Sequence, residues 1–449
     1  MQPNGGVTVT TAAATATPMR RVAAACLVGS AIEFYDFMIY GTAAALVFPT
    51  VFFPHLSPAL GTIASMGTFA SAFVSRPIGG LAFGYFGDRL GRKKTLIATL
   101  LIMAVSTMSV GAVPSTATIG VAAPLILVAL RLLQGFAVGG EWAGSALLSA
   151  EYAPDGRRGR FGMFTLLGGG AAVVLSSLTF LGVNFTIGEN SPAFMQWGWR
   201  IPFLISAGLI AIAFYVRMRI DETPVFVAEK ALNVLPRAPI AELWRLQRRE
   251  IVLAGGSILG GMSFVYMSNT YLTRYAHSEL GYTRGFIWAV GVLGGLVSIA
   301  FVALSATLSD RVGRRRLMLL GWAGCVPWAL VVIPLIDTGN PVFYAVAIAG
   351  MCAIGGIGSG PTGAFIPELF ATRYRYSGSA LAINLAGILG GAVPPLIAGT
   401  LQATYGSWVI GPMLAGLSLT GLVCTYLLPE TIGTALHSTR GEAEVSASG

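Results

Sequence analysis

Five ionisable side chains lie inside apolar stretches that are long enough to cross a bilayer. Glu33 and Asp36 share the first stretch, Arg76 lies in the second, and Arg131 and Glu141 lie in the fourth. Each would cost about 2.5–3.5 kcal/mol if it faced lipid, so we expect the five to face one another or a water-filled cavity. Three acids and two bases leave one carboxylate without a basic partner, and desolvation beside a like charge favours its protonated form. The chemistry that this set predicts is proton binding and release.

The spacing of these residues predicts which of them meet. Glu33 lies twelve residues beyond Arg21, which is about 18 Å along a helix and near the middle of a bilayer. Asp36 is three residues farther on and shares the helix face of Glu33, which Tyr40 continues. Arg131 reaches a similar depth from the other side of the membrane. We therefore expect Arg131 to pair with Glu33 or Asp36.

Arg76 and Glu141 both lie deeper toward the cytoplasmic side, and we expect them to pair in the same way. The resulting hypothesis couples two ligands: protonation of Glu33 or Asp36 releases Arg131, which then binds a substrate carboxylate. The alternative is a static network of buried ions that only fixes the helix bundle. Ionisable groups inside a membrane are functional by default, which favours the coupling hypothesis.

The second half of the chain offers polar, uncharged groups on two of its apolar stretches. Tyr266 and Asn269 lie in the seventh stretch and Asn384 in the eleventh. Such side chains either contact a substrate or join helices by hydrogen bonds, and the sequence leaves both interpretations open. The predicted substrate site comprises Tyr40, Arg76, Arg131, Glu141, Tyr266, Asn269 and Asn384.

The composition indicates a membrane protein. Of the 449 residues, 55% are hydrophobic and only 10% are charged, against about 25% charged residues in soluble domains. The mean hydropathy is +0.73. Apolar segments of spanning length occur at 22–47, 60–86, 95–114, 119–149, 161–184, 197–219, 251–276, 285–308, 317–336, 341–366, 377–402 and 406–428. The predicted fold class is an all-α membrane protein with twelve transmembrane helices in two pseudo-symmetric six-helix bundles.

A charged segment divides these twelve stretches into six plus six. We expect a disordered cytoplasmic tail at 1–18, a first bundle at 19–219, a cytoplasmic linker at 220–250, a second bundle at 251–429 and a cytoplasmic tail at 430–449. The four cysteines stand far apart in apolar runs, without the spacing of a metal site or a disulfide. We therefore expect no metal and no cofactor.

The basic residues predict the orientation in the membrane. With a cytoplasmic N-terminus, 23 of the 28 Lys and Arg residues fall in cytoplasmic segments and three fall near the outer face. This excess follows the positive-inside rule and places both termini in the cytoplasm. Clustering in short loops also accounts for the net charge of +9 without a nucleic-acid partner. The expected partners are a lipid bilayer, a proton and a small-molecule substrate, and we expect a monomer to be functional.

The two halves repeat one another at the ends of their helices. Asp88-Arg89-Leu-Gly91-Arg92 follows the second stretch, and Asp310-Arg311-Val-Gly313-Arg314 follows the eighth, 222 residues later. Repeated halves are a common construction of transporters, with the substrate site between them. Acids and arginines at helix ends can pair across helices, since the guanidinium fork matches a carboxylate. The alternative is that the basic residues only set the topology. The predicted cytoplasmic gate comprises Asp88, Arg89, Arg92, Glu151, Glu222, Asp310, Arg311, Arg314, Glu368 and Glu430.

Several of these motifs resemble those of a known superfamily. The Asp-Arg-x-Gly-Arg loop of both halves resembles the signature loop of the major facilitator superfamily, and Arg131-Leu-Leu-Gln134-Gly135 resembles its proton-linked motif on the fourth helix. A narrower set resembles the metabolite:proton symporter family, which includes transporters of shikimate, 2-oxoglutarate, citrate and proline or betaine. That set is Glu33-Phe-Tyr35-Asp36, Ser75-Arg76-Pro77, Gly139-Gly140-Glu141-Trp142, Trp199-Arg200-Ile-Pro202 and Glu222-Thr-Pro-Val-Phe226.

The resemblance covers about residues 20–430 and implies the major facilitator fold, alternating access and proton-coupled uptake of a small metabolite, either an organic acid or a zwitterion. It implies gate ion pairs that close the cytoplasmic side and break as that side opens. The stretch 166–170 departs from the Gln and Pro that the family often carries there, so the substrate stays open. The alternative function is a proton-driven exporter of drugs or metabolites, but 161–184 lacks the Pro typical of exporters. No catalytic set of residues indicates an enzyme, and the expected location is a bacterial inner membrane.

Overall fold

The computed structural model describes residues 19–90, 92–139, 141–154, 156–188, 191–218, 240–371 and 374–433. The first half contains α1 (Met19–Leu46), α2 (Phe48–Phe52), α3 (Pro58–Leu90), α4 (Arg92–Ala112), α5 (Thr116–Ile119), α6 (Ala122–Val138), α7 (Glu141–Tyr152), α8 (Arg158–Ile187), α9 (Pro192–Gln196), the 3-10 turn η1 (Gly198–Arg200) and α10 (Ile201–Met218). The second half contains α12 (Ile240–Ser257), α13 (Leu259–Asn269), α14 (Tyr271–Ser278), α15 (Arg284–Val312), α16 (Arg314–Asp337), α17 (Pro341–Ser359), α18 (Thr362–Glu368), α19 (Arg375–Ala386), the π-helix η3 (Gly387–Ala392), α20 (Val393–Tyr405), the 3-10 turn η4 (Ser407–Val409) and α21 (Ile410–Leu427). The expected tail 1–18 and most of the expected linker lie outside this part.

The described chain is helical, and its helices are long enough to span a bilayer. Ten helical stretches in it are long and apolar enough to cross a membrane. The 33-residue α3 and the shorter apolar α6 bring the number to twelve, as the sequence predicted. Apolar side chains such as Ile212 (53% exposed) and Leu320 (63% exposed) lie on the flanks, as expected for surfaces that face lipid. The predicted all-helical, twelve-span fold class is confirmed.

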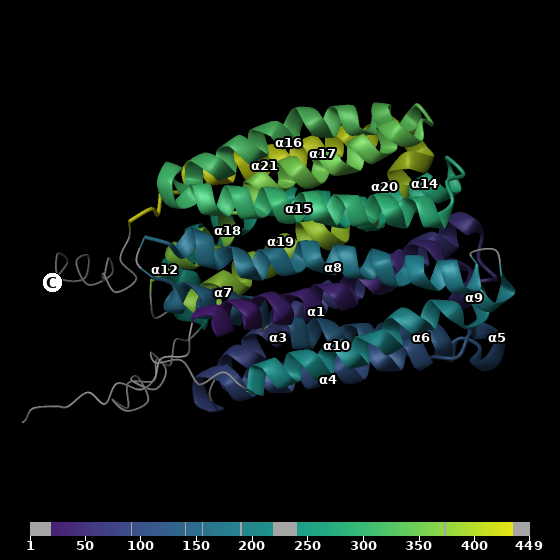
Figure 1. The fold of residues 1–449 in the computed structure, drawn as a ribbon, viewed down its shortest axis with the longest axis horizontal. Coiled ribbons are helices and arrows are strands. Elements are labelled where there is room, and N and C mark those ends of the chain that lie inside the picture. The colour runs from purple at the N-terminus through teal and green to yellow at the C-terminus, as the bar shows by residue number, and fades with distance from the viewer. Residues whose placement is uncertain are drawn as a thin grey trace, which may run out of the picture.

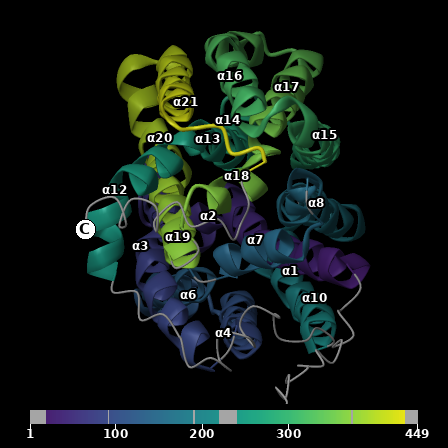
Figure 2. The same cartoon turned by 90° about the vertical axis from the view of Figure 1, so that its left-hand side faces the viewer.

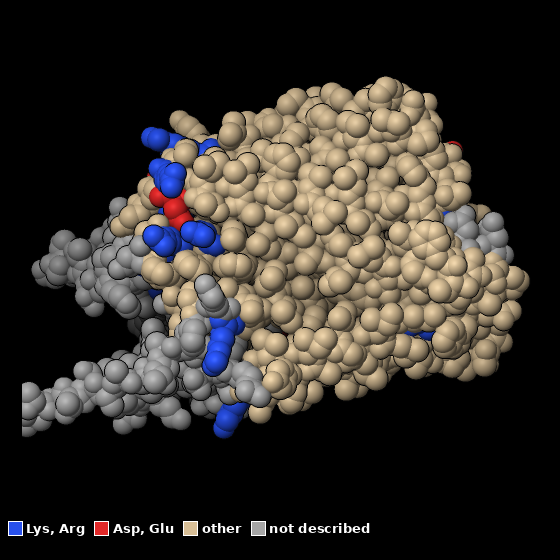
Figure 3. Space-filling model, viewed as in Figure 1, with Lys and Arg blue, Asp and Glu red and all other residues tan. Residues whose placement is uncertain are grey.

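The spans run along the long axis of the molecule and form two groups (Figure 1). Viewed from one end, the helices of the second half lie above those of the first half, with α8 beside α15 and α3 beside α19 (Figure 2). Lys and Arg gather at that same end, whereas the long flank that faces the viewer carries almost none of them (Figure 3). We call it the basic end. It contains the start of α8 and the junction between α15 and α16.

Several spans are interrupted where the sequence predicted one continuous segment. The fourth is split into α6 and α7 around Gly139, the seventh is broken at Thr270, and the eleventh contains the π-helix η3. In the eleventh span, Pro394 and Pro395 lack the N–H groups that an α-helix would use at these positions. The second half also begins with α12 inside the segment that was expected to be linker. Interrupted helices are a feature of transporter binding sites, and Gly139, at the first of these interruptions, lines one of the pockets described below.

Glycines allow α3 and α6 to touch backbone to backbone. A Cβ atom added to Gly135 would lie 1.9 Å from the carbonyl oxygen of Ala72, and one added to Gly79 would lie 1.8 Å from that of Phe136. Main-chain atoms cannot rotate away as a flexible side chain can. The close contact therefore fixes the position of Arg76 on α3 relative to Arg131 on α6.

We expect Gly135→Ala to lower the yield of folded protein several-fold, because overpacking of this kind costs about 1–3 kcal/mol. Gly182→Ala is the matched control: Gly182 also lies inside a helix, and a Cβ atom there would meet no atom within 4 Å. Size-exclusion chromatography of a detergent extract measures the yield. Equal monodisperse peaks from the two variants would contradict the packing described for α3 and α6.

Candidate functional site

Asp36 is held by two hydroxyl groups from neighbouring helices. Its side chain is 1% exposed. Thr107 of α4 donates a hydrogen bond to Oδ2 at 2.7 Å, and Ser206 of α10 donates one to Oδ1 at 2.5 Å. Both donors are uncharged, and Asp36 has no ion-pair partner among the described residues. The acid can therefore gain or lose a proton without breaking an ion pair.

A chain of hydrogen bonds connects Asp36 to Arg131. Nη1 of Arg131 donates to Oε1 of Gln134 at 2.9 Å, Nε2 of Gln134 donates to Oγ1 of Thr107 at 2.6 Å, and Thr107 donates to Asp36. All three bonds point the same way, from the cation to the carboxylate, so they polarise one another. Protonation of Asp36 weakens the acceptor at the end of this chain, and Arg131 at the other end then loses part of its stabilisation.

The expected direct ion pair of Arg131 with Glu33 or Asp36 is not found in the described structure. The Arg131 side chain is fully buried, and its guanidinium carbon lies 4.1 Å from the ring centroids of both Phe37 and Tyr40. Its Nε and Nη2 have no hydrogen-bond partner. The rings supply part of the stabilisation that an acid was expected to give, since a cation is attracted to the face of an aromatic ring.

Arg76 shares the ring of Phe37 with Arg131. Its guanidinium carbon lies 4.1 Å from the centroids of Phe37 and Phe73. None of the ion pairs found among the described residues joins Arg76 to Glu141, its expected partner. Glu141 itself is 1% exposed at the start of α7. The guanidinium carbons of Arg76 and Arg131 each lie 4.1 Å from the centroid of Phe37, so the distance between these two carbons cannot exceed the sum of the two values. Two cations this close in a dry site attract an anion.

A cavity lies between the two halves. It encloses about 120 Å³ and is bounded by α1 and α8 of the first half and by α13, α15, α17 and α18 of the second half. Most of its lining is apolar, and its polar lining consists of uncharged groups. We call it the main cavity. Phe34, Met38, Leu166, Met262, Phe264 and Met351 line it together with several glycines, Ser298, Ser359 and Thr362.

A smaller pocket of about 20 Å³ shares the residues Phe34, Met262 and Tyr266 with the main cavity. The side chains of Glu33, Arg76, Tyr266 and Asn384 line it, so it joins charged groups of the first half to polar groups of the second. We call it the charged pocket. Asn384 donates a long hydrogen bond of 3.5 Å to the carbonyl of Gly139, across the boundary between the halves.

Another small pocket of about 30 Å³ adjoins the main cavity. The two share Ser268 and Asn269, and the small pocket adds Thr42, Ser177 and Thr273. Of the predicted substrate residues, the structure brings Arg76, Tyr266, Asn269 and Asn384 to this connected set of spaces, together with Glu33. Tyr40, Arg131 and Glu141 line none of the three. Tyr40 instead donates to Thr68 at 2.9 Å and packs against Arg131.

Three contributors to the site were not predicted: Thr107, Ser206 and Phe37. Hydroxyl and phenyl groups are common in membrane helices, and the sequence gives no spacing that separates these three from their neighbours. Gln134 stands in the quoted helix-four motif but had no predicted role. Its hydrogen bonds with Arg131 and Thr107 give it the role of linking these two residues.

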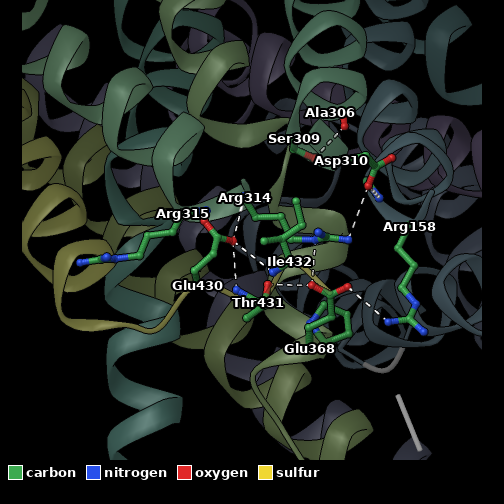
Figure 4. A network of polar contacts seen from close by, with 12 residues as sticks. Arg158, Ala306, Ser309, Asp310, Arg314, Arg315, Glu368, Glu430, Thr431 and Ile432 are labelled. Atoms are coloured by element: carbon green, nitrogen blue, oxygen red, sulfur yellow. Dashed lines mark hydrogen bonds and ion pairs between the residues drawn. The ribbon is translucent and has the colours of Figure 1, made fainter. Parts of the chain in front are cut away.

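At the basic end, Asp310 of the second half binds the first half. Its Oδ1 accepts a hydrogen bond from the backbone N–H of Gly159 at 2.7 Å, and its Oδ2 accepts one from Arg160 at 2.9 Å (Figure 4). These N–H groups belong to the first turn of α8, whose own N-cap residue supplies no side-chain hydrogen bond. The carboxylate thus satisfies donors that an α-helix leaves open and complements the positive end of the helix dipole.

Glu368 continues this network. Its Oε2 lies 2.8 Å from Nε of Arg314 and accepts a hydrogen bond from Thr431 at 2.7 Å, and its Oε1 lies 3.8 Å from Nη1 of Arg158 (Figure 4). Arg314 also lies 3.5 Å from Asp310. Arg158 belongs to the first half, so a second polar contact crosses the boundary. We call Arg158, Asp310, Arg314, Glu368 and Thr431 the basic-end network.

Glu430 acts within the second half alone. It accepts hydrogen bonds from the backbone N–H groups of Arg314 at 2.9 Å and Arg315 at 3.1 Å, at the start of α16. Of the other predicted gate residues, Arg311 is exposed beside the network. The backbones of Asp88, Arg89, Arg92 and Glu151 lie at helix ends, but their side chains, and Glu222 as a whole, lie outside the described part.

Comparison with known proteins decides the family. The model of the Major Facilitator Superfamily matches residues 27–384. The chain belongs to the major facilitator superfamily. Within it, the chain is 40% identical over 417 residues to the inner membrane metabolite transport protein YhjE of Escherichia coli K12, a match that covers 92% of this chain and 94% of that protein.

Two further relatives have names that state their substrates. The shikimate transporter of Escherichia coli K12 is 35% identical, with 87% of this chain and 89% of that protein covered. The proline/betaine transporter of Salmonella typhimurium is 31% identical, with 92% and 84% covered. Among solved structures, the xylose transporter XylE from E. coli in a partially occluded inward-open conformation is similar, with 18% identity, a TM-score of 0.70, and 93% and 99% covered. The prediction of a metabolite transporter with the major facilitator fold is confirmed.

Proposed function

We propose that the protein is a proton-coupled uptake transporter of a small metabolite, with Asp36 as the proton carrier. The observation that carries the proposal is the buried carboxylate held by two hydroxyl groups and joined through Thr107 and Gln134 to Arg131. A proton at Asp36 therefore changes the charge balance of the site that contains both buried arginines.

The substrate in this proposal occupies the main cavity and the charged pocket. Both spaces are lined from both halves, so a bound molecule contacts both groups of helices at once. Arg76 lines the charged pocket, and Arg131 lies behind the shared Phe37 ring, so Arg76 is the contact residue and Arg131 acts through the field of its charge. Proton and anion each make the other's binding more favourable, which is the linkage that symport requires.

The basic-end network serves as the gate in this cycle. In the present state, the two halves touch at the basic end through Asp310 and Glu368, and they touch near the opposite end where Phe180 of α8 stacks on Trp288 of α15 at 5.4 Å. Access from either side requires one of these contacts to separate. The excess of basic residues at this end supports an orientation in which the network and both termini lie on the cytoplasmic side of a bacterial inner membrane.

Uptake into proteoliposomes tests the proposal. Purified protein in vesicles with an alkaline interior is screened with labelled organic acids and osmolytes. We expect at least one compound to accumulate above its outside concentration, and the accumulation to collapse when a protonophore is added. Accumulation that survives the protonophore, or uptake that only equilibrates, would remove proton coupling. The protein is also reconstituted at a dilution that leaves at most one molecule in each vesicle. Transport by these vesicles tests whether a monomer is functional.

A further inference from the structure

We propose that the substrate is a monoanionic carboxylate with an uncharged, largely apolar body. The proposal rests on the proton-coupled uptake proposed above and names the chemical class that the same site accepts. Its basis is the contrast between the charged pocket, which contains a buried arginine with an unsatisfied donor, and the main cavity, whose described lining residues carry no charge.

The charged pocket presents hydrogen-bond donors in need of an acceptor. The guanidinium carbon of Arg76 lies 4.1 Å from the ring centroids of both Phe37 and Phe73, and the Arg76 side chain lines the pocket. Within the part of the chain that the structure describes, Nε of Arg76 has no hydrogen-bond partner, and neither has the hydroxyl of Tyr266, although Arg76 is only 7% exposed and Tyr266 only 1%. A buried donor left unsatisfied costs about 1–3 kcal/mol. A carboxylate has the charge and the two acceptor atoms that satisfy both donors.

The main cavity has the opposite character. Phe34, Met38, Met262 and Met351 contribute carbon and sulfur surface, and the polar groups there are hydroxyls, the amide of Asn269 and the thiol of Cys352. None of the described residues that line it carries a charged side chain. A second carboxylate of a substrate would lose its hydration there without gaining a counter-ion, which costs several kcal/mol. The cavity therefore favours a body that is neutral and mostly apolar.

The charge balance of the buried groups points to the same class. The five buried ionisable side chains of this region comprise three acids, Glu33, Asp36 and Glu141, and two arginines, Arg76 and Arg131. One proton together with one monoanion leaves this balance unchanged, whereas a dianion adds a charge that nothing offsets. Glu33 lines the same pocket as Arg76 and is the group that an ammonium would meet. A zwitterion is therefore the competing ligand, and the test includes it.

Four compounds on one ring framework separate these classes. They are cyclohexanecarboxylate, its neutral amide, trans-cyclohexane-1,4-dicarboxylate and the zwitterion 1-aminocyclohexanecarboxylate. Calorimetric titration of the full-length purified protein measures affinity, and repetition in two buffers with different ionisation heats measures proton uptake. We expect cyclohexanecarboxylate to bind at least about tenfold more tightly than the other three. The amide lacks the negative charge, and the dicarboxylate and the zwitterion each add a second charged group. We also expect it to bind with uptake of a proton.

Arg76→Gln should weaken cyclohexanecarboxylate binding about tenfold or more and leave the weak binding of the amide unchanged. Arg245→Gln, at an exposed position on α12, is the matched control and should bind as the unaltered protein does. Stronger binding of the dicarboxylate or the zwitterion would overturn the substrate class, as would failure of cyclohexanecarboxylate to bind at millimolar concentration. Those outcomes leave the proposed function intact, because protonophore-sensitive accumulation is measured separately with whichever compound the uptake screen selects.

Discussion

Asp36→Asn is expected to abolish accumulation of substrate against its gradient while exchange of substrate across the membrane continues. An inward gradient of two pH units supplies about 2.7 kcal/mol for each proton, which supports an accumulation of about 100-fold when one proton enters with each substrate. Asparagine keeps the shape of the side chain but cannot take up a proton. The expected accumulation ratio of the variant is therefore about one.

The reason lies in the contacts of the carboxylate. Thr107 and Ser206 both donate to Asp36, so an amide oxygen can keep one of the two bonds and the fold is expected to persist. Thr107→Val provides a graded variant, because it leaves the acid and its bond from Ser206 in place but removes the hydroxyl that donates to Asp36 and accepts from Gln134. We expect it to accumulate substrate less than the unaltered protein and more than Asp36→Asn.

The second half supplies a matched control. Asp337 also accepts hydrogen bonds from two hydroxyl groups, those of Tyr275 and Ser407, each at 2.6 Å. It lies at the end of α16, away from the three spaces that we assign to the substrate. Asp337→Asn should accumulate substrate normally. Uphill accumulation by Asp36→Asn in the same vesicles, or its loss in Asp337→Asn, would show that this carboxylate is not the coupling group.

The large cost of charge in a membrane explains how much of the site the sequence could predict. Glu33, Asp36, Arg76 and Arg131 stand out because each is tolerated only in the interior. Their partners were harder to predict. Phe37 lies against both arginines where acids were expected, and an aromatic ring inside a membrane helix carries no mark that separates this role from ordinary packing.

The fold followed from the lengths of the apolar segments, but the interruptions within them did not. A hydropathy pattern reads Thr270 or Gly387–Ala392 as continuous helix, because both remain apolar enough to lie inside a span. The direction in which the Glu33 side chain points could not be predicted from the sequence either. Its three-residue spacing from Asp36 predicted one shared target, whereas Glu33 lines the charged pocket and Asp36 faces α4 and α10. A small rotation about a helix axis decides between them, and tertiary packing sets that rotation.

Asp310→Ala is expected to open the basic end. The Asp310 carboxylate accepts two backbone hydrogen bonds from α8, and a hydrogen bond to a charged group contributes about 1.5–3 kcal/mol. These bonds join the two halves, so they stabilise only the state in which the basic end is closed. Loss of about 3 kcal/mol from that state alone changes the ratio of closed to open molecules by about 100-fold.

Glu430→Ala is the control that separates gating from simple loss of stability. Glu430 also accepts two backbone hydrogen bonds at a helix start, but its partners on α16 belong to its own half. Both the closed and the open state lose these bonds equally. The variant should therefore unfold at a lower temperature and yet keep the balance between the two states.

Reactivity of Cys352 reports the opening. Its thiol lines the main cavity, so a variant that keeps Cys352 and replaces Cys26, Cys325 and Cys424 by serine carries one informative label site. In inside-out vesicles, a membrane-impermeant maleimide should label Cys352 at least about tenfold faster in Asp310→Ala than in Glu430→Ala, and transport by Asp310→Ala should fall by a similar factor. Equal labelling rates would mean that Asp310 only caps α8 and does not hold the two halves together. That outcome would leave Arg158 and Glu368 as the described side-chain ion pair across the boundary, and at 3.8 Å between nitrogen and oxygen this pair is too weak to act as the gate alone.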